Sequence, residues 1–195
     1  QLNKYPKKSL SNFNILDLGC GGGLICEPLA RLGANITGID FIKKNIITAK
    51  KHAKKLNVNI EYFHQNLNNI KLKKKYDAIL ILEVLEHIED WGKIIVNVKK
   101  LLKPKGKIIF STINRTFYSK IFAIFLAEEI LKWIPKKTHN YSKLVKPREL
   151  VSFLEKNNMK VLDTTGLVFN PILNEWSLSK KMTKINYFCT AQKIN

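Results

Sequence analysis

The feature that most constrains the fold is a glycine-rich turn near the start of the chain. A short apolar stretch, residues 14–18, runs directly into it, and glycines occupy positions 19 and 21–23. Residues 26–31 then favour a helix, in which Pro28 is tolerated because it lies in the first turns. Glycines let the backbone approach a ligand closely, and the helix that follows offers free N–H groups. The pattern predicts a buried strand, a ligand-binding turn and a helix.

A second predicted strand, residues 35–40, ends in an acidic side chain, Asp40. Asp40 follows the turn by about 20 residues, the spacing at which a β-turn-α-β unit places the acid that grips a ribose. The dinucleotide fingerprint Gly-x-Gly-x-x-Gly is incomplete, because Gly19 and Gly21 match it but Leu24 holds the third place. This substitution counts against a nicotinamide-dependent dehydrogenase, which is one of the alternatives.

With Asp17 ahead of the glycines, the turn resembles the S-adenosylmethionine site of the Rossmann-like class I methyltransferases, whose motif is hydrophobic-Asp-x-Gly-x-Gly-x-Gly. The resemblance implies that the backbone around Gly19 and Gly21 approaches the methionine part of the cofactor. It also implies that the carboxylate of Asp40 accepts both ribose hydroxyls. We count Asp17 and Val84 among the further cofactor contacts.

The rest of the chain alternates predicted strands and helices, which indicates a parallel sheet with right-handed crossovers. Further strands are expected at 58–63, 76–82 and 107–112, and helices at 42–56, 91–102 and 145–157. The last two strands, 161–165 and 186–192, should form an antiparallel pair separated by a loop at 166–179. The predicted fold is α/β and Rossmann-like, with a mostly parallel seven-stranded sheet and helices on both faces.

A chain of 195 residues corresponds to about one domain, here 1–195, with a helical insert at about 116–140. It begins at Gln1 without Met, and we expect that an N-terminal part is missing. Three cysteines without metal spacing suit a reducing cytosol. The net charge of +19 implies nucleic acid, an anionic membrane or a solvated lysine surface.

A second group of polar residues, Glu83, Glu86 and His87, follows the predicted strand 76–82. If the chain turned into a helix there, the three side chains would project from one face. Two carboxylates and an imidazole can hold a divalent cation with open coordination positions, two of which a catechol could fill. The alternative is a Glu-His pair that shapes the pocket without a metal.

Further motifs make the resemblance more specific. The stretch Ser111-Thr112-Ile113-Asn114-Arg115-Thr116 is similar to the Ser-Thr-x-Asn-Arg signature of the ubiquinone biosynthesis O-methyltransferases. Similar segments occur at 26–30, 135–139, 146–150, 165–171 and 186–188. The resemblance implies methyl transfer from S-adenosylmethionine to phenolic hydroxyls of polyprenylated catechol or hydroquinone intermediates. It also implies a magnesium set that maps onto Glu83, Glu86 and His87.

The insert and the residue after it add two expectations. His139 could act as the general base on the substrate hydroxyl, although a lone histidine is more often structural. The insert is apolar and aromatic with flanking lysines, which favours contact with an anionic membrane surface over a simple lid. We therefore expect a cytoplasmic enzyme peripheral to the inner face of the membrane, or on the matrix side in a mitochondrion. Other ubiquinone-biosynthesis proteins are candidate partners.

The net charge also leaves a nucleic-acid methyltransferase as an alternative. Such an enzyme usually carries a base-methylation motif such as Asn-Pro-Pro-Tyr at the fourth strand, or basic residues interleaved with aromatics. Residues 83–86 are acidic at that place, so we expect no nucleic-acid partner. Another small-molecule methyltransferase and a non-catalytic binding module are the remaining alternatives.

Overall fold

The computed structural model describes residues 9–119, 141–170 and 173–194. In this described part, the strands are hydrogen-bonded in the order β3-β2-β1-β4-β5-β8-β6-β7. The chain divides into two compact units, and β4 and β5 each run from the first into the second. The first unit takes in residues up to 81 with 93–108, and the second takes in 82–92 with 109–194.

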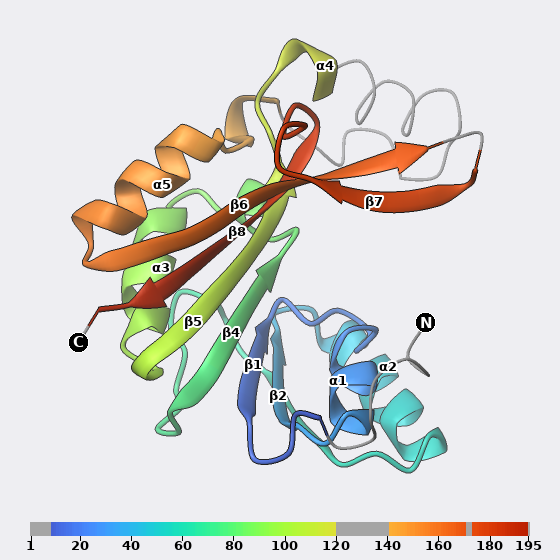
Figure 1. Cartoon of the computed structure of the whole chain (residues 1–195). Helices are drawn as coiled ribbons and strands as arrows, with labels where there is room; N and C mark the ends of the chain where they lie inside the picture. Colours follow the sequence, from blue (N-terminus) through green and yellow to red (C-terminus); the bar gives the residue numbers. More distant parts are fainter. Residues whose placement is uncertain (1–8, 120–140, 171–172, 195) are drawn as a thin grey trace. The chain divides into compact units, whose positions relative to one another are not determined.

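The first unit is built on parallel strands, and β1 lies beside β2 (Figure 1). β1 also pairs with β4, and β2 pairs with β3. Its strands are β1 (Asn14–Leu18), β2 (Asn35–Asp40), β3 (Ile60–His64) and β4 (Tyr76–Leu82). Its helices are α1 (Cys26–Arg31), α2 (Lys43–Lys55) and α3 (Trp91–Lys99). In α2 the buried residues Ile46, Ala49 and Ala53 form one stripe between lysines, and this stripe packs the helix against β2 and β3.

The second unit carries the antiparallel strands, because β6 pairs with both β7 and β8. Its strands are the end of β5 (Leu102–Ile113), β6 (Met159–Asn170), β7 (Glu175–Ser179) and β8 (Asn186–Lys193). Short helical turns are η2 (Leu85–His87), α4 (Phe117–Ser119) and η4 (Tyr141–Lys143). Helix α5 (Pro147–Lys156) begins at a proline whose fixed φ suits the first turn, and it packs against β6 and β8 through the buried Leu150 and Leu154.

The predicted fold class is confirmed, with mostly parallel strands and antiparallel strands at the C-terminal end. The predicted strand count of seven is wrong. An additional strand, β7, lies in the stretch 166–179 that we expected to be a loop, and β6 continues to Asn170 to pair with it. The pairing brings the rings of Phe169 and Trp176 to 5.0 Å between centroids, a cross-strand contact between residues seven positions apart.

Most of the predicted insert, residues 120–140, lies outside the described residues, as do His139 and the aromatic residues of that segment. Of the insert only 116–119 is described, and it contains the short helix α4. Thr116 and Ser119 exchange hydrogen bonds at its start, because each side-chain oxygen accepts the other residue's backbone N–H at 3.1 Å. No helix in the described ranges is long and apolar enough to cross a membrane.

Candidate functional site

The glycine turn leaves open space at one position. Gly21 has φ of 53°, which L side chains rarely adopt, and a Cβ built there would meet nothing within 4 Å. Gly23 is different, because its Cβ would come within 2.4 Å of the Tyr62 hydroxyl oxygen. Gly23 therefore makes room for packing inside the protein, whereas the backbone at Gly21 is accessible to a ligand. The N–H of Gly19 is already used, since it donates to the carbonyl of Ile39 at 2.8 Å.

Asp40 joins this turn to the start of α2. Its Oδ2 accepts a hydrogen bond from the N–H of Gly21 at 2.9 Å. Its Oδ1 accepts from the N–H of Ile42 at 2.7 Å and from the side-chain amide of Asn45 at 3.3 Å. The residue is only 4% exposed, so these donors fix the carboxylate in place. The spacing in the sequence predicted Asp40 as a ribose ligand, but it gave no sign of the bond to Gly21.

Asp17 is a buried carboxylate in the same unit, with 3% of its surface exposed. Burial raises the pKa of Asp17 to about 6, and the nearby charge of Asp40 adds to this rise. The thiol of Cys26 opposes the rise, because it donates a hydrogen bond to Oδ2 at 3.2 Å. A positive charge beside it would favour the ionised form. The contact of Asp17 with the cofactor stays a prediction from the sequence.

Phe41 is a candidate that the sequence reasoning missed. It directly follows Asp40, and 58% of its surface is exposed. Nε2 of His64 lies 2.9 Å from the carbonyl oxygen of Phe41 and donates to it in the tautomer protonated at Nε2, which fixes the backbone there. An exposed aromatic ring beside a carboxylate suits a planar base. The signal available in the sequence was a large apolar residue directly after the acid at a strand end.

In the second unit, the first two polar residues of the Ser-Thr-x-Asn-Arg signature hold the two predicted carboxylates. Ser111 Oγ donates to Glu83 Oε1 at 2.6 Å, and Thr112 Oγ1 donates to Glu86 Oε2 at 2.8 Å. Successive side chains of a strand point to opposite faces, so Glu83 and Glu86 approach β5 from opposite sides. The condition for Glu83, Glu86 and His87 to project from one helix face is therefore not met, and their role as metal ligands stays a prediction.

The backbone of residues 83–87 also forms no α-helix that would align the three side chains. Residues 85–87 form a single 3₁₀ turn, and Glu83 ahead of it has φ of 53°, a strained conformation for a side chain with a Cβ. Glu86 is 3% exposed, whereas Glu83 and His87 are exposed. Within residues 9–119, 141–170 and 173–194, no three His, Cys, Asp or Glu side chains are grouped so that they could hold a metal ion.

The second half of the signature fixes the loop between β7 and β8. The side-chain amide of Asn114 donates to the carbonyl of Thr183 at 2.7 Å, and its backbone N–H donates to the carbonyl of Ile185 at 2.8 Å. Thr116 Oγ1 donates to the carbonyl of Lys184. This loop also crosses β6 at Gly166, where a Cβ would lie 1.8 Å from the carbonyl oxygen of Met182. Asn114 and Thr116 therefore act on the protein's own backbone.

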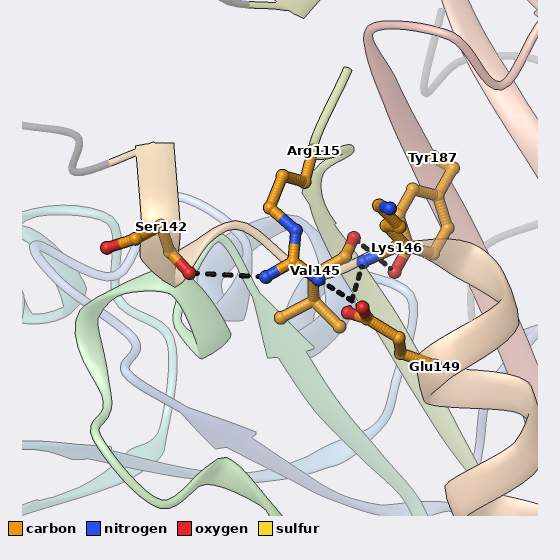
Figure 2. Close-up of polar contacts among 6 residues, drawn as sticks. All are labelled: Arg115, Ser142, Val145, Lys146, Glu149 and Tyr187. Atoms are coloured by element: carbon orange, nitrogen blue, oxygen red, sulfur yellow. Dashed lines mark hydrogen bonds and ion pairs between the residues drawn. The ribbon is translucent and has the colours of Figure 1, made fainter.

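Arg115, between them, holds the segment that leads into α5 (Figure 2). Its Nη1 donates to the carbonyl of Ser142 at 3.3 Å, and its Nη2 forms an ion pair with Glu149. Glu149 also accepts the backbone N–H of Lys146 at 3.1 Å, which caps the first turn of α5. One guanidinium thus serves two partners at once, a geometry that a lysine cannot reproduce.

Tyr187 of β8 supports the same segment. Its hydroxyl donates to the carbonyl of Val145 at 3.0 Å, as Figure 2 shows. Burial raises the pKa of Tyr187, and the charges of Cys189, Glu149 and further carboxylates add to the rise. The hydroxyl therefore stays protonated and remains a donor.

A family model described as "Methyltransferase domain" matches residues 9–186. The ubiquinone biosynthesis O-methyltransferase of Bartonella tribocorum is 45% identical over 99% of this chain and 79% of that protein. The enzyme of the same name from Rickettsia typhi is 45% identical over 98% of this chain and 78% of that protein. The one from Pelagibacter ubique is 46% identical over 92% of this chain and 75% of that protein. The chain belongs to the ubiquinone biosynthesis O-methyltransferase family.

Solved structures show the same fold at low sequence identity. An S-adenosylmethionine-dependent methyltransferase from Methanosarcina mazei matches with a TM-score of 0.71 at 19% identity, over 99% of this chain and 96% of that one. The magnesium protoporphyrin IX methyltransferase of Synechocystis with bound SAH matches with a TM-score of 0.68 at 21% identity, over 95% and 75%. This family member therefore has the class I methyltransferase fold.

The predicted site residues of this O-methyltransferase family member are only partly brought together. Gly21 and Asp40 are hydrogen-bonded, and the charge of Asp40 raises the pKa of Asp17. Val84 belongs to the second unit and is 8% exposed, and its contact with the cofactor stays a prediction. The role of His139 also stays a prediction, since His139 lies outside the described residues.

Proposed function

We propose that this chain catalyses S-adenosylmethionine-dependent O-methylation of phenolic hydroxyls on polyprenylated catechol or hydroquinone intermediates of ubiquinone biosynthesis. The sequence support is the 45% identity to a named relative over 99% of the chain. The structural observation that carries the cofactor part is the open space beside Gly21, bordered by the fixed carboxylate of Asp40.

The residues of the first unit fit S-adenosylmethionine, because a Cβ at Gly21 would occupy space that is open in this structure. When bound, the cofactor supplies an electrophilic methyl group on a sulfonium. Asp17 would face its cationic part, and the backbone at Gly19 and Gly21 would approach its methionine part. A carboxylate has about four acceptor positions, and Asp40 uses three of them for protein donors. Two ribose hydroxyls would therefore replace the longest of these contacts, from Asn45.

The phenol must lose its proton to become a nucleophile, and two residues are candidates for receiving it. His139 is predicted from the sequence as this general base. Glu86 is the candidate in the described part of the second unit, because its Oε1 is buried without a hydrogen-bond partner there. Replacing Glu86 with glutamine keeps the bond from Thr112 within reach but removes the base. Loss of turnover at unchanged cofactor affinity would support this role, and full turnover would leave it to His139.

Magnesium is implied by the resemblance alone, and the residues do not fit it as they stand. Glu83 and Glu86 are bonded to consecutive residues of β5 and approach it from opposite faces. No step of the proposed reaction therefore passes through a metal. Turnover in excess chelator tests this directly. Full activity would assign the three residues to pocket shape, whereas a loss that added magnesium restores would require Glu83, Glu86 and His87 to regroup.

We also propose that the enzyme acts at an anionic membrane surface, on the cytoplasmic or mitochondrial matrix side. The net charge of +19 and the apolar prenyl tail of the proposed substrate support this. The insert that we predicted as the contact lies mostly outside the described residues. Other proteins of the pathway remain candidate partners.

The assay that tests the function supplies S-adenosylmethionine with a prenylated catechol and follows the methylated product by mass spectrometry. Bulk tRNA serves as the competing acceptor, and NADH serves as the competing cofactor in calorimetry. We expect S-adenosylmethionine to bind, NADH not to bind, and only the catechol to be methylated. Methylation of tRNA without methylation of the catechol would replace the proposal with a nucleic-acid methyltransferase.

A further inference from the structure

The β6–β7 hairpin has an apolar side that is exposed. In its register Phe169 lies opposite Trp176, and Leu167 lies opposite Leu178. These four side chains share one face because they alternate with residues that point to the other face. Trp176 is 61% exposed, Leu178 is 67% exposed and Phe169 is 37% exposed, whereas Leu167 is half-buried. We call these four residues the hairpin face.

It is unusual for the apolar side of two paired strands to be this exposed. A strand with one apolar side normally buries that side against a core. β7 lies at the end of the strand order, and all its side chains except the half-buried Ser179 are exposed. Leu173 at 64% and Met182 at 48% exposure add to the apolar surface of the same part of the chain. Contiguous exposed apolar surface of this kind marks an interaction site.

Three lysines follow the hairpin in the chain. Lys180, Lys181 and Lys184 come directly after β7, and the only acid within β7, Glu175, points to the face opposite Trp176. Lys180 forms an exposed ion pair with Asp163 at 3.5 Å. Nζ of Lys184 lies 4.9 Å above the ring centroid of Tyr118, which is itself 49% exposed. The apolar surface is therefore accompanied by positive charge.

We propose that the hairpin face binds an anionic lipid surface. The inference rests on the proposed action at a membrane and names a contact for it within the described part of the second unit. An apolar sheet face can be covered by a second copy of the chain or by a lipid surface, and the charge of the chain decides between these two. A second copy of the chain also carries +19 and is repelled, whereas an anionic bilayer attracts the lysines and accepts the apolar side chains. A tryptophan among apolar residues is typical of the bilayer interface.

The first experiment measures sedimentation of the full chain with phosphatidylglycerol-containing vesicles and with phosphatidylcholine vesicles. The double variant Trp176→Ser and Leu178→Ser should reduce binding to the anionic vesicles by about tenfold. The matched control is Ile47→Ser, which removes a 46% exposed apolar side chain from α2 in the first unit and should bind like the wild type. Both variants change exposed side chains, so their thermal midpoints should stay close to that of the wild type.

The second experiment uses Trp176 as a reporter. The chain has three tryptophans, so replacing Trp91 and Trp133 with phenylalanine leaves Trp176 as the only one. Its emission should shift to the blue when anionic vesicles are added, and high salt should reverse the shift. An unchanged emission in the presence of bound vesicles would overturn the inference.

The outcomes separate this inference from the function on which it rests. If the double variant binds vesicles as well as the wild type, the hairpin face is not the contact, although the membrane proposal stands. If the wild type ignores anionic vesicles, the membrane proposal itself fails. If the double variant instead dissociates a dimer seen by sedimentation velocity, the occupant is a second copy and the inference is wrong. Turnover of a short-tailed, water-soluble catechol tests the chemistry separately and should be the same in all three proteins.

Discussion

The glycine turn and the Ser-Thr-x-Asn-Arg signature are both short motifs, but the protein uses their residues in different ways. In the turn, Gly21 and Asp40 are 19 positions apart within one β-α-β unit, and their contact borders open space. In the signature, the side chains reach partners 26 to 69 positions away, all of them parts of the protein. The turn is therefore suited to binding a ligand, whereas the signature mainly stabilises the second unit. A motif that identifies a family need not contact its substrate.

The largest expected effect tests the turn. Asp40→Ala should weaken S-adenosylmethionine binding at least about a hundredfold, since charge-assisted hydrogen bonds contribute roughly 1.5–3 kcal/mol each. It should also lower stability, because Gly21 and Ile42 lose their acceptor. Calorimetry measures the affinity. The control is Asp77→Ala, which likewise removes an acceptor for a backbone N–H, that of Asn14, and should leave the affinity unchanged. Equal losses in both variants would contradict a ribose role for Asp40.

A second prediction concerns pH and the buried Asp17, whose neighbours are Asp40 and Cys26. Its pKa is raised to about 6 in the folded protein, so its contribution to stability is present below 3.8 and is lost as pH rises through about 6. The loss should be about 3 kcal/mol, because the pKa rises from 3.8 to about 6 and each pKa unit corresponds to about 1.4 kcal/mol. Asp17→Asn should flatten this dependence in chemical denaturation of the cofactor-free protein. Saturating S-adenosylmethionine should also flatten it if a cationic group faces Asp17, whereas an unaltered slope would place that group elsewhere.

The third prediction tests the signature. Asn114→Ala should lower the free energy of unfolding by about 1.5 kcal/mol, because a buried hydrogen bond to the carbonyl of Thr183 is lost. Cofactor affinity should not change, since the partners of Asn114 belong to the second unit. Urea denaturation and calorimetry measure the two quantities. The exposed Asn69 provides the control, and Asn69→Ala should change neither. A large drop in cofactor affinity with normal stability would mean that the signature binds the ligand, as the turn does, and that the two motifs do not differ in this way.

The smallest expected effect tests whether the ribose replaces one of the hydrogen bonds that Asp40 accepts from the protein. If ribose hydroxyls replace the amide of Asn45, then Asn45→Ala should change cofactor affinity less than about threefold, because its hydrogen bond is absent from the bound state. Any change should be towards tighter binding. Calorimetry alongside Asp40→Ala measures it. A tenfold weakening would mean that Asn45 holds the cofactor and that the ribose does not displace it.

The errors of the sequence reading have a common origin. Glu83, Glu86 and His87 are close in the sequence, so a helix would have aligned them, but β5 holds Glu83 and Glu86 on opposite faces. The sequence does not predict β7, because a five-residue strand with both sides exposed has no buried periodicity to detect. The sequence does not single out Phe41, because the exposure of its ring cannot be inferred from its position next to an acid.

The sequence by itself determined the strand-turn-helix-strand unit, the acid at its end and the alternation that produces a mostly parallel sheet. These features are local, since hydrophobic periodicity and the spacing from Gly21 to Asp40 depend only on nearby residues. The tertiary structure alone decided which side chains the signature engages, how the loop after β7 is fixed, and that the hairpin face is exposed. The physical reason is that these contacts join residues up to 69 positions apart, and only the pairing of distant strands brings them within hydrogen-bond distance.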